Sequence, residues 1–412
     1  MELLKRRPQP HNPLPESRYE VLALFTGAMV GASLWLMATG ALMPSFAAAL
    51  HIGQTELGII LSVQMVGSVA MTSVAGLLTD RFGDKAVVLW SGLIMGLSLI
   101  VASLVSNFVW LVVWLPIYGI GYAAVTPAGS HAIIFFFKKA DRGLAMGVRQ
   151  CGVPIAGTLG ALLLPAVALR FDYRGALLTA GVLTLVACVV ASALYREPKE
   201  LQGERMSAGA MLAEMLTIAR DARLILLTLT SMVLICSQFA LMGFLTLTLE
   251  RDGGYGAPLA VGIFTLSQAA AIVGRLAWGW ASDNVFRGSR SLPLAAVCVL
   301  VALVAAAVAA IGTQTPPWAA TALACALGLT AESWLGVSII GFAEIGGEEH
   351  SGSALGVALT WTLLAAFVTP TIFGAVVEAH GFAFAWRSLA LLELLGVVPA
   401  LLATRWTARR TA

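Results

Sequence analysis

The sequence predicts an all-α membrane protein with twelve transmembrane helices, and three features indicate this fold class. Of the 412 residues, 59% are hydrophobic and 11% are charged, whereas a soluble domain carries about 25% charged residues. The mean hydropathy is +0.88. The apolar residues form continuous runs, as over 297–312, without the alternation of a membrane β-barrel. These features exclude a soluble enzyme, and the net charge of +3 is too small for nucleic-acid binding.

Twelve apolar runs, each close to the roughly 20 residues that a spanning helix needs, are separated by short polar breaks. The first run follows a polar, basic, Pro-rich segment and is long enough to span, so it is not a cleaved signal. The predicted spans are 21–43, 56–78, 86–105, 109–136, 143–165, 175–195, 221–248, 259–281, 291–312, 318–343, 352–375 and 385–403.

The longest polar connection falls between the sixth and seventh spans and divides the chain into two sets of six. The expected organisation is a cytoplasmic tail over 1–20, a six-helix bundle over 21–195, a linker over 196–220, a second bundle over 221–403 and a cytoplasmic tail over 404–412.

The distribution of basic residues predicts the orientation in the membrane. With the N-terminus inside, 21 of the 25 Lys and Arg residues lie on the cytoplasmic side or at nearby helix ends, as the positive-inside rule requires. We therefore expect an integral protein of the bacterial cytoplasmic (inner) membrane, with both termini in the cytoplasm.

A loop motif occurs once in each half, after the second and the eighth spans. Its residues are Gly76, Asp80, Arg81, Gly83 and Lys85 in the first half, and Gly279 and Asp283 in the second. Gly76 and Asp80 are about one helical turn apart and share a face. A glycine there allows another helix to approach closely, and a carboxylate there can pair with a neighbouring helix end or an arginine. Two parallel six-helix repeats are an established transporter architecture.

This loop resembles the signature loop of the major facilitator superfamily, and the resemblance covers all twelve spans. It implies two six-helix bundles, related by pseudo-twofold symmetry, that rock around a central cavity in alternating access. In that family the loop is a conformational latch when the inner side is closed, which makes the seven motif residues latch candidates. The alternative is a generic polar turn with basic anchors.

Two arginines inside predicted spans are candidates for binding an anion. Arg149 lies about six residues into the fifth span, and Arg275 lies about as far from the inner end of the eighth. The resemblance implies that these spans face each other across the cavity. Two guanidinium groups at similar depth suit a carboxylate, which they can hold with paired hydrogen bonds. The alternatives are snorkelling to the inner surface and ion pairs between helices.

Further polar residues lie beside these arginines. Thr265 and Gln268 share a helical face with Arg275, and Gln150 follows Arg149. The stretch from Gly274 through Asp283 resembles the eighth helix of oxalate–formate and monocarboxylate transporters, which implies that an Arg in this position binds the substrate carboxylate. Trp361 lies at mid-depth in the eleventh span, where it is either a cavity wall or part of the core.

Two titratable residues are candidates for proton coupling. Glu332 lies about fourteen residues into the tenth span, where a charge is costly and is usually paired or neutralised. A buried carboxyl of this kind can carry a proton, or it can be a structural hydrogen-bonding group. His131 lies near the inner end of the fourth span and titrates near neutral pH, although a histidine at a helix end is more often a simple hydrogen-bonding residue.

These residues predict a secondary transporter for a small organic anion, such as a monocarboxylate, coupled to protons. A drug or metabolite exporter is the main alternative, and a receptor or assembly factor on the same fold is a remote one. The chain has no HExxH motif, P-loop or Cys/His cluster, so neither an enzyme nor a resident metal or cofactor is expected. The expected partners are an anionic small molecule, protons and the lipid bilayer; nucleic acid is not expected, and the protein is expected to be a monomer.

Overall fold

The computed structural model describes residues 15–137, 142–198 and 216–411. The predicted linker over 196–220 and both predicted tails therefore lie partly outside the described residues. The described chain is helical, with these helices: α1 (Pro15–Leu50), α2 (Gln54–Ser103), α3 (Phe108–Phe136), α4 (Arg142–Gln150), α5 (Gly152–Leu194), α7 (Ala222–Arg251), α8 (Ala257–Asn284), α9 (Ser291–Val308), α10 (Pro317–Ala331), α11 (Leu335–His380) and α12 (Phe382–Thr411).

Three of these helices are long because each continues through a turn. The backbone leaves helical geometry at Gly83 inside α2, at Phe171 and Asp172 inside α5, and at Gly347 inside α11. The described residues contain 11 helical segments that are long and apolar enough to cross a membrane, and one of them, Ala145–Leu194, has 50 residues. Since that length serves two crossings, the twelve predicted spans are confirmed.

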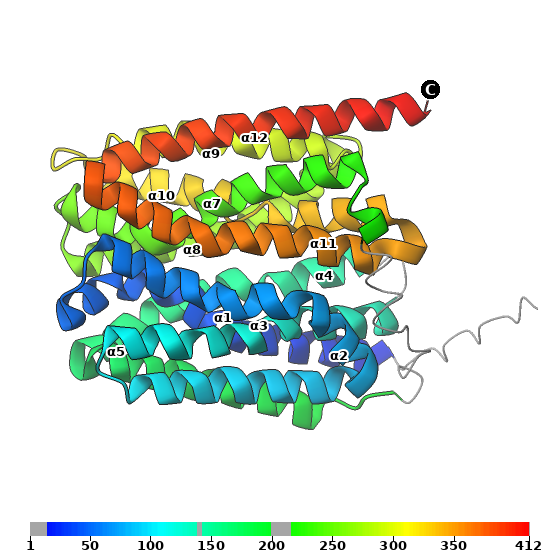
Figure 1. Cartoon of the computed structure of the whole chain (residues 1–412), viewed down its shortest axis with the longest axis horizontal. Helices are drawn as coiled ribbons and strands as arrows, with labels where there is room; N and C mark the ends of the chain where they lie inside the picture. Colours follow the sequence, from blue (N-terminus) through cyan, green and yellow to red (C-terminus); the bar gives the residue numbers. More distant parts are fainter. Residues whose placement is uncertain (1–14, 138–141, 199–215, 412) are drawn as a thin grey trace, which may run out of the picture.

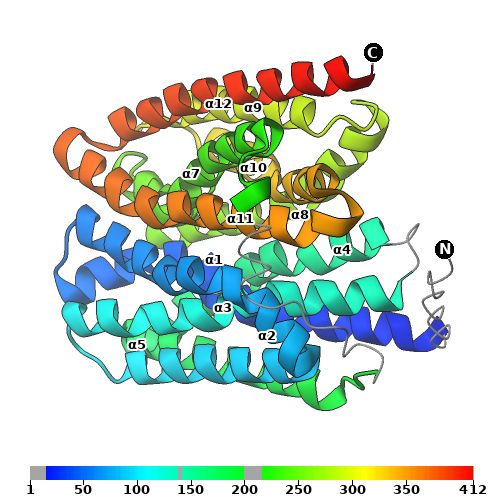
Figure 2. The same ribbon diagram turned by 45° about the vertical axis from the view of Figure 1, so that its right-hand side comes forward.

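The helices form two bundles that lie side by side. Figure 1 shows α1–α5 in one half of the molecule and α7–α12 in the other, with the helices nearly parallel to the long axis. The start of α1 and the end of α12 lie at the same end, on the right of Figure 2. Between the halves, α1 packs on α7, α2 packs on α11, and α5 packs on α8. We call these three contacts the seam.

Each half contains a pair of helices whose backbones come into direct contact at a glycine. A Cβ atom on Gly119 would overlap the backbone carbonyl oxygen of Gln64, and a Cβ on Gly328 would overlap that of Ser267. The first pair joins the second and fourth spans, and the other joins the eighth and tenth. Only glycine allows two backbones to come so close, so the same packing device occurs at corresponding places in both halves.

The seam is closed at the end opposite the start of α1. There Thr371 donates hydrogen bonds to Ser62 Oγ from its backbone nitrogen (3.2 Å) and its hydroxyl (2.8 Å). A Cβ atom on Gly40 would overlap the carbonyl oxygen of Met242, and one on Gly58 would overlap that of Pro370. Backbones from the two halves are therefore in direct contact at this end.

Candidate functional site

The helical bonding of the fifth span is interrupted next to Arg149, because Pro154 has no N–H, while Cys151 keeps helical dihedrals (φ −63°, ψ −18°). Helix α4 ends at Gln150, and α5 begins at Gly152. The Arg149 side chain is 1% exposed. Its Nη2 donates to Ser130 Oγ (3.0 Å), and its Nη1 lies above Gly129, 2.8 Å from where a Cβ would be. Among the described residues, Nε and Nη1 of Arg149 have no hydrogen-bond acceptor.

Arg275 reaches the same break from the other half. It projects from α8, and its Nη1 donates to the backbone carbonyl of Gln150 over a long 3.4 Å. Within the described chain, its Nε and Nη2 have no acceptor. Arg275 thus contacts the residue next to Arg149, and each guanidinium group has two nitrogen atoms without an acceptor among the described residues. Buried guanidinium groups without acceptors are costly, so the arrangement suits an anion.

The tenth predicted span, 318–343, lies within the membrane-crossing segment Pro317–Gly347, but its helix is interrupted near the middle. Helix α10 ends at Ala331 and α11 begins at Leu335. Glu332 lies in the break, with φ −101° and ψ 0°, and its side chain is fully buried. Gln268 Nε2 donates to Glu332 Oε1 (2.7 Å), while Glu332 Oε2 has no partner among the described residues.

The Glu332 carboxyl group and the Arg275 guanidinium group interact electrostatically. Both belong to the C-terminal half, and opposite charges attract strongly where water is excluded. With Glu332 ionised, the two arginines and this carboxylate carry one net positive charge; with Glu332 protonated they carry two. An anion would therefore bind more strongly after Glu332 takes up a proton.

Tyr122 also belongs to this group of residues, and it is not among the residues predicted from the sequence. Its ring stacks on Tyr118, with centroids 6.0 Å apart and planes 17° apart, and it interacts electrostatically with both arginines. When Gly119 is aligned with Gly328, Tyr122 corresponds to Ala331, the neighbour of Glu332. The glycine repeat was the signal that could have found it.

The other residues predicted to bind substrate differ from one another in burial and in hydrogen bonding. Thr265 is 7% exposed and donates to the Val261 carbonyl of its own helix (2.8 Å). The Gln150 side chain is 9% exposed, and its Oε1 has no donor in the described part of the chain. Trp361 is 52% exposed. The side chain of His131 is outside the described residues.

The loop between the second and third spans is held within its own half. Glu197 Oε1 accepts from the backbone nitrogens of Asp84 (2.5 Å) and Lys85 (3.4 Å), and Lys85 Nζ donates to the Tyr195 carbonyl (3.2 Å). A carboxylate in this position caps the helix that starts after Gly83. The end of the sixth span and the motif loop are thereby tied together.

Of the remaining latch candidates, Arg81 and Asp283 are exposed and Gly279 is half-buried. Arg81 is exposed, with its guanidinium carbon 5.3 Å from the centre of the Phe82 ring. Asp283 pairs with Arg290 (2.5 Å), whose guanidinium also binds Glu344 (2.8 Å). Gly279 has open space around it. The Asp80 side chain and the surroundings of Gly76 lie outside the described residues.

Gly83 is expected to resist substitution more than its counterpart in the second half. Gly83 and Gly288 have φ values of 81° and 80°, so a side chain is strained at both positions, and the ψ of 163° at Gly83 is a conformation essentially restricted to glycine. Only at Gly83 would the new Cβ also overlap the Glu197 carboxylate, while Gly288 faces open space. Thermal unfolding should therefore show a larger fall in melting temperature for Gly83→Ala than for Gly288→Ala. Equal falls would mean that the Glu197 contact contributes nothing.

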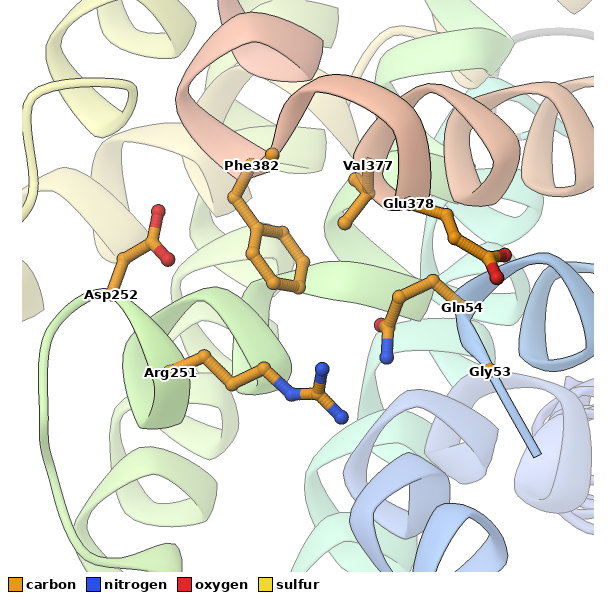
Figure 3. Close-up of a pocket in the computed structure, with 8 residues that line it drawn as sticks. Gly53, Gln54, Arg251, Asp252, Val377, Glu378 and Phe382 are labelled. Carbon is orange, nitrogen blue, oxygen red and sulfur yellow. The ribbon is translucent and has the colours of Figure 1, made fainter. Parts of the chain in front are cut away.

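A pocket of about 380 Å³ opens on the seam at the closed end and is lined by both halves. Figure 3 shows Arg251 extending toward Gln54, with Glu378 above Gly53. Glu378 Oε2 accepts from the backbone nitrogen of Thr55 (3.2 Å) and from its hydroxyl, so it caps the start of α2 from the other half. None of the predicted site residues lines this pocket.

The unused hydrogen-bonding capacity lies on buried atoms of Arg149, Gln268, Arg275 and Glu332, with Tyr122 beside the two arginines. This group offers N–H donors from both halves and one carboxyl group that can change its charge. In the part of the chain that the structure describes, no three His, Cys, Asp or Glu side chains are arranged to hold a metal ion. This chemistry is suited to holding an anion and a proton.

Comparison with known proteins identifies similar chains. Residues 23–370 match the sequence profile of the Major Facilitator Superfamily. An uncharacterised MFS-type transporter of Mycobacterium tuberculosis is 25% identical over 382 residues, covering 92% of this chain and 84% of that protein. A probable sulfoacetate transporter of Cupriavidus necator is 23% identical over 349 residues, covering 79% and 80%.

Among solved structures, a bacterial homologue of the human lysosomal transporter Spinster, in an inward-facing and unoccupied conformation, has a similar fold. Its TM-score is 0.69 at 14% identity, and the match covers 94% of this chain and 96% of that one. At this identity the likeness shows the fold alone.

Proposed function

The chain belongs to the major facilitator superfamily and is a membrane transporter, and from this premise we propose that it carries a small monocarboxylate coupled to protons. One observation supports the anionic substrate above the others. Arg149 and Arg275 come from different halves, Arg275 contacts the residue next to Arg149, and each keeps two nitrogen atoms without an acceptor among the described residues. A carboxylate between them would satisfy these donors and join the halves.

Other residues take supporting roles in this proposal. Gln150, Thr265, Gln268 and Trp361 would complete the substrate site, and His131 would assist Glu332 in proton transfer. A relative named as a transporter of sulfoacetate, which is an anion, agrees with an anionic cargo. The loop residues Gly76, Asp80, Arg81, Gly83, Lys85, Gly279 and Asp283 would form the latch of the state that is closed on the other side.

The orientation follows from the basic residues. We place both termini in the cytoplasm of a bacterial cell, because 21 of the 25 Lys and Arg residues then lie on the inner side. The closed end of the seam then faces outward. In this state the anion site would be reached from the cytoplasm, and transport would require the seam contacts to separate.

Proton coupling would follow from the charge of Glu332. When ionised, Glu332 attracts Arg275 and lowers the net positive charge that a substrate meets. When protonated, it leaves Arg275 to the substrate carboxylate. Binding of the proton and of the anion would therefore favour each other, as co-transport requires.

The test is thermal stabilisation of the purified protein by acetate, lactate, pyruvate, benzoate and 3-phenylpropionate. A ligand that binds only the folded state raises the melting temperature; at one hundred times its Kd it adds about 2.7 kcal/mol. We expect one of these acids to stabilise the protein and Arg275→Gln to remove the effect. Arg174→Gln is the control, because Arg174 is exposed and remote in the sequence from both breaks.

Two results would contradict the proposal. If Arg275→Gln kept the full response to the acid, Arg275 would not bind the substrate. If no acid had any effect and lipophilic cations stabilised the protein, the exporter alternative would be correct, and both arginines would have structural roles.

A further inference from the structure

The backbone carbonyl of Gln150 has lost its usual partner inside the helix. In a continuous helix it would accept from the nitrogen of residue 154, but that residue is Pro154, which has no N–H. The next nitrogen, that of Ile155, bonds to the Cys151 carbonyl instead (3.0 Å). Pro154 therefore leaves the Gln150 carbonyl as a buried acceptor that must be satisfied from elsewhere.

Arg275 supplies the missing donor from across the seam. Its Nη1 reaches the Gln150 carbonyl at 3.4 Å. A second contact joins the same two helices: the Gln268 amide lies where a Cβ of Gly157 would be. Gln150 and Gly157 are seven residues apart, as are Gln268 and Arg275, so one face of α8 matches one face of the fifth span in register.

We propose that Pro154 is a positioning residue for the anion site, because it frees the Gln150 carbonyl that holds Arg275 in the substrate-free protein. This inference rests on the proposed function of Arg275. A substrate carboxylate must then take the guanidinium group from that carbonyl. Since the carbonyl belongs to the N-terminal half and Arg275 to the C-terminal half, the exchange weakens the seam as it forms the substrate contact.

Glu332 does not serve the same purpose, although it also attracts Arg275. It belongs to the same half as Arg275, so this attraction persists when the two halves move apart. The Gln150 carbonyl belongs to the other half, so Arg275 loses this partner when the seam separates. The contact with the Gln150 carbonyl therefore links the occupancy of the site to the geometry of the two halves.

The experiment restores the N–H group at position 154. In Pro154→Ala the Gln150 carbonyl can bond within its own helix, so Arg275 loses its resting partner. A hydrogen bond to a charged group is worth a few kcal/mol at most, and this one is long, so lactate and benzoate should bind about three- to tenfold more tightly. Pro154→Gly, which also restores the N–H but not the helix propensity, should shift the affinity in the same direction.

Pro165→Ala is the matched control, because Pro165 lies in the same helix, α5. We expect it to leave both affinities unchanged. If Pro154→Ala and Pro154→Gly bind lactate and benzoate as the wild type does, the inference is wrong while the proposed function stands.

A second readout needs no substrate. The melting temperature of the ligand-free protein should fall in Arg275→Gln, and it should fall less when Pro154→Ala is already present, because the bond is then missing beforehand. Additive effects would contradict the role of Pro154. If Arg275→Gln bound lactate and benzoate normally, the proposed function would fail, and this cycle would still test the bond itself.

Discussion

Replacing Glu332 by glutamine is expected to abolish the accumulation of substrate driven by a proton gradient. Glutamine has nearly the same shape and can still bond to Gln268, but it cannot take up or release a proton. Arg275 would lose its competing carboxylate, so the anion would still bind and exchange. In reconstituted vesicles we expect uptake against a gradient to fall to the equilibrium level and counterflow to continue.

The pH dependence has a definite sign. Wild-type uptake should rise as the outer side is acidified, because protonation of Glu332 favours anion binding, whereas the Glu332→Gln rate should be flat. Glu393→Gln is the control, because Glu393 is the same kind of residue, fully buried in the C-terminal half, without a place in the proposed mechanism. A normal pH response in Glu332→Gln would move proton coupling to another residue.

Replacing Gly40 by alanine is expected to stop transport by a different route. The added methyl group would overlap the backbone carbonyl oxygen of Met242 in the other half, and a backbone atom cannot turn aside as a side chain can. The seam could then close only with strain of about 1–3 kcal/mol or more, as in overpacked cores. We expect the state open at this end to predominate and turnover to be lost.

Gly27→Ala is the matched control for this change, since Gly27 lies in the same helix with nothing within 4 Å of an added Cβ. Closure can be followed by disulfide formation between cysteines placed at Ser62 and Thr371, after the five native cysteines are replaced. The hydroxyl groups of these two residues are 2.8 Å apart in the closed seam. If Gly40→Ala cross-linked as fast as Gly27→Ala, the seam would tolerate the methyl group.

The number of spans and the division into halves could be predicted because each depends on local properties of the sequence. Apolar runs of spanning length are a direct consequence of the bilayer as solvent. The repeated loop motif is likewise local: the Gly-to-Asp spacing is the same at Gly76 and at Gly279, although the second copy has two extra residues after Asp283. These signals do not depend on how the helices pack.

The break at Glu332 could not be predicted, because the residues around it carry no helix-breaking signal. The stretch from Thr330 to Trp334 contains neither proline nor glycine. In the structure, the Ser333 hydroxyl group bonds to the Gly328 carbonyl (2.9 Å), and the Trp278 indole donates to the Leu329 carbonyl (2.8 Å). Carbonyls at the end of α10 thus find partners outside the helical pattern.

The position of Tyr122 and the close backbone contact at the seam could not be predicted from the sequence either. The sequence pattern around a tyrosine in an apolar run is the same whether its side chain packs in the core or lies beside two arginines. A glycine such as Gly40 does not reveal which backbone will approach it. Both facts depend on distances between helices that are remote in the sequence.

The placement of Gln268, Arg275 and Glu332 in one half has a consequence for measurement. If the halves rotate as rigid bodies, the separations among these three residues stay constant, while their separation from Arg149 changes. An infrared band of the Glu332 carboxyl group would then report proton occupancy in either orientation of the protein. A pair of spin labels across the seam would report orientation alone, so charge state and geometry become two independent spectroscopic coordinates of the same cycle.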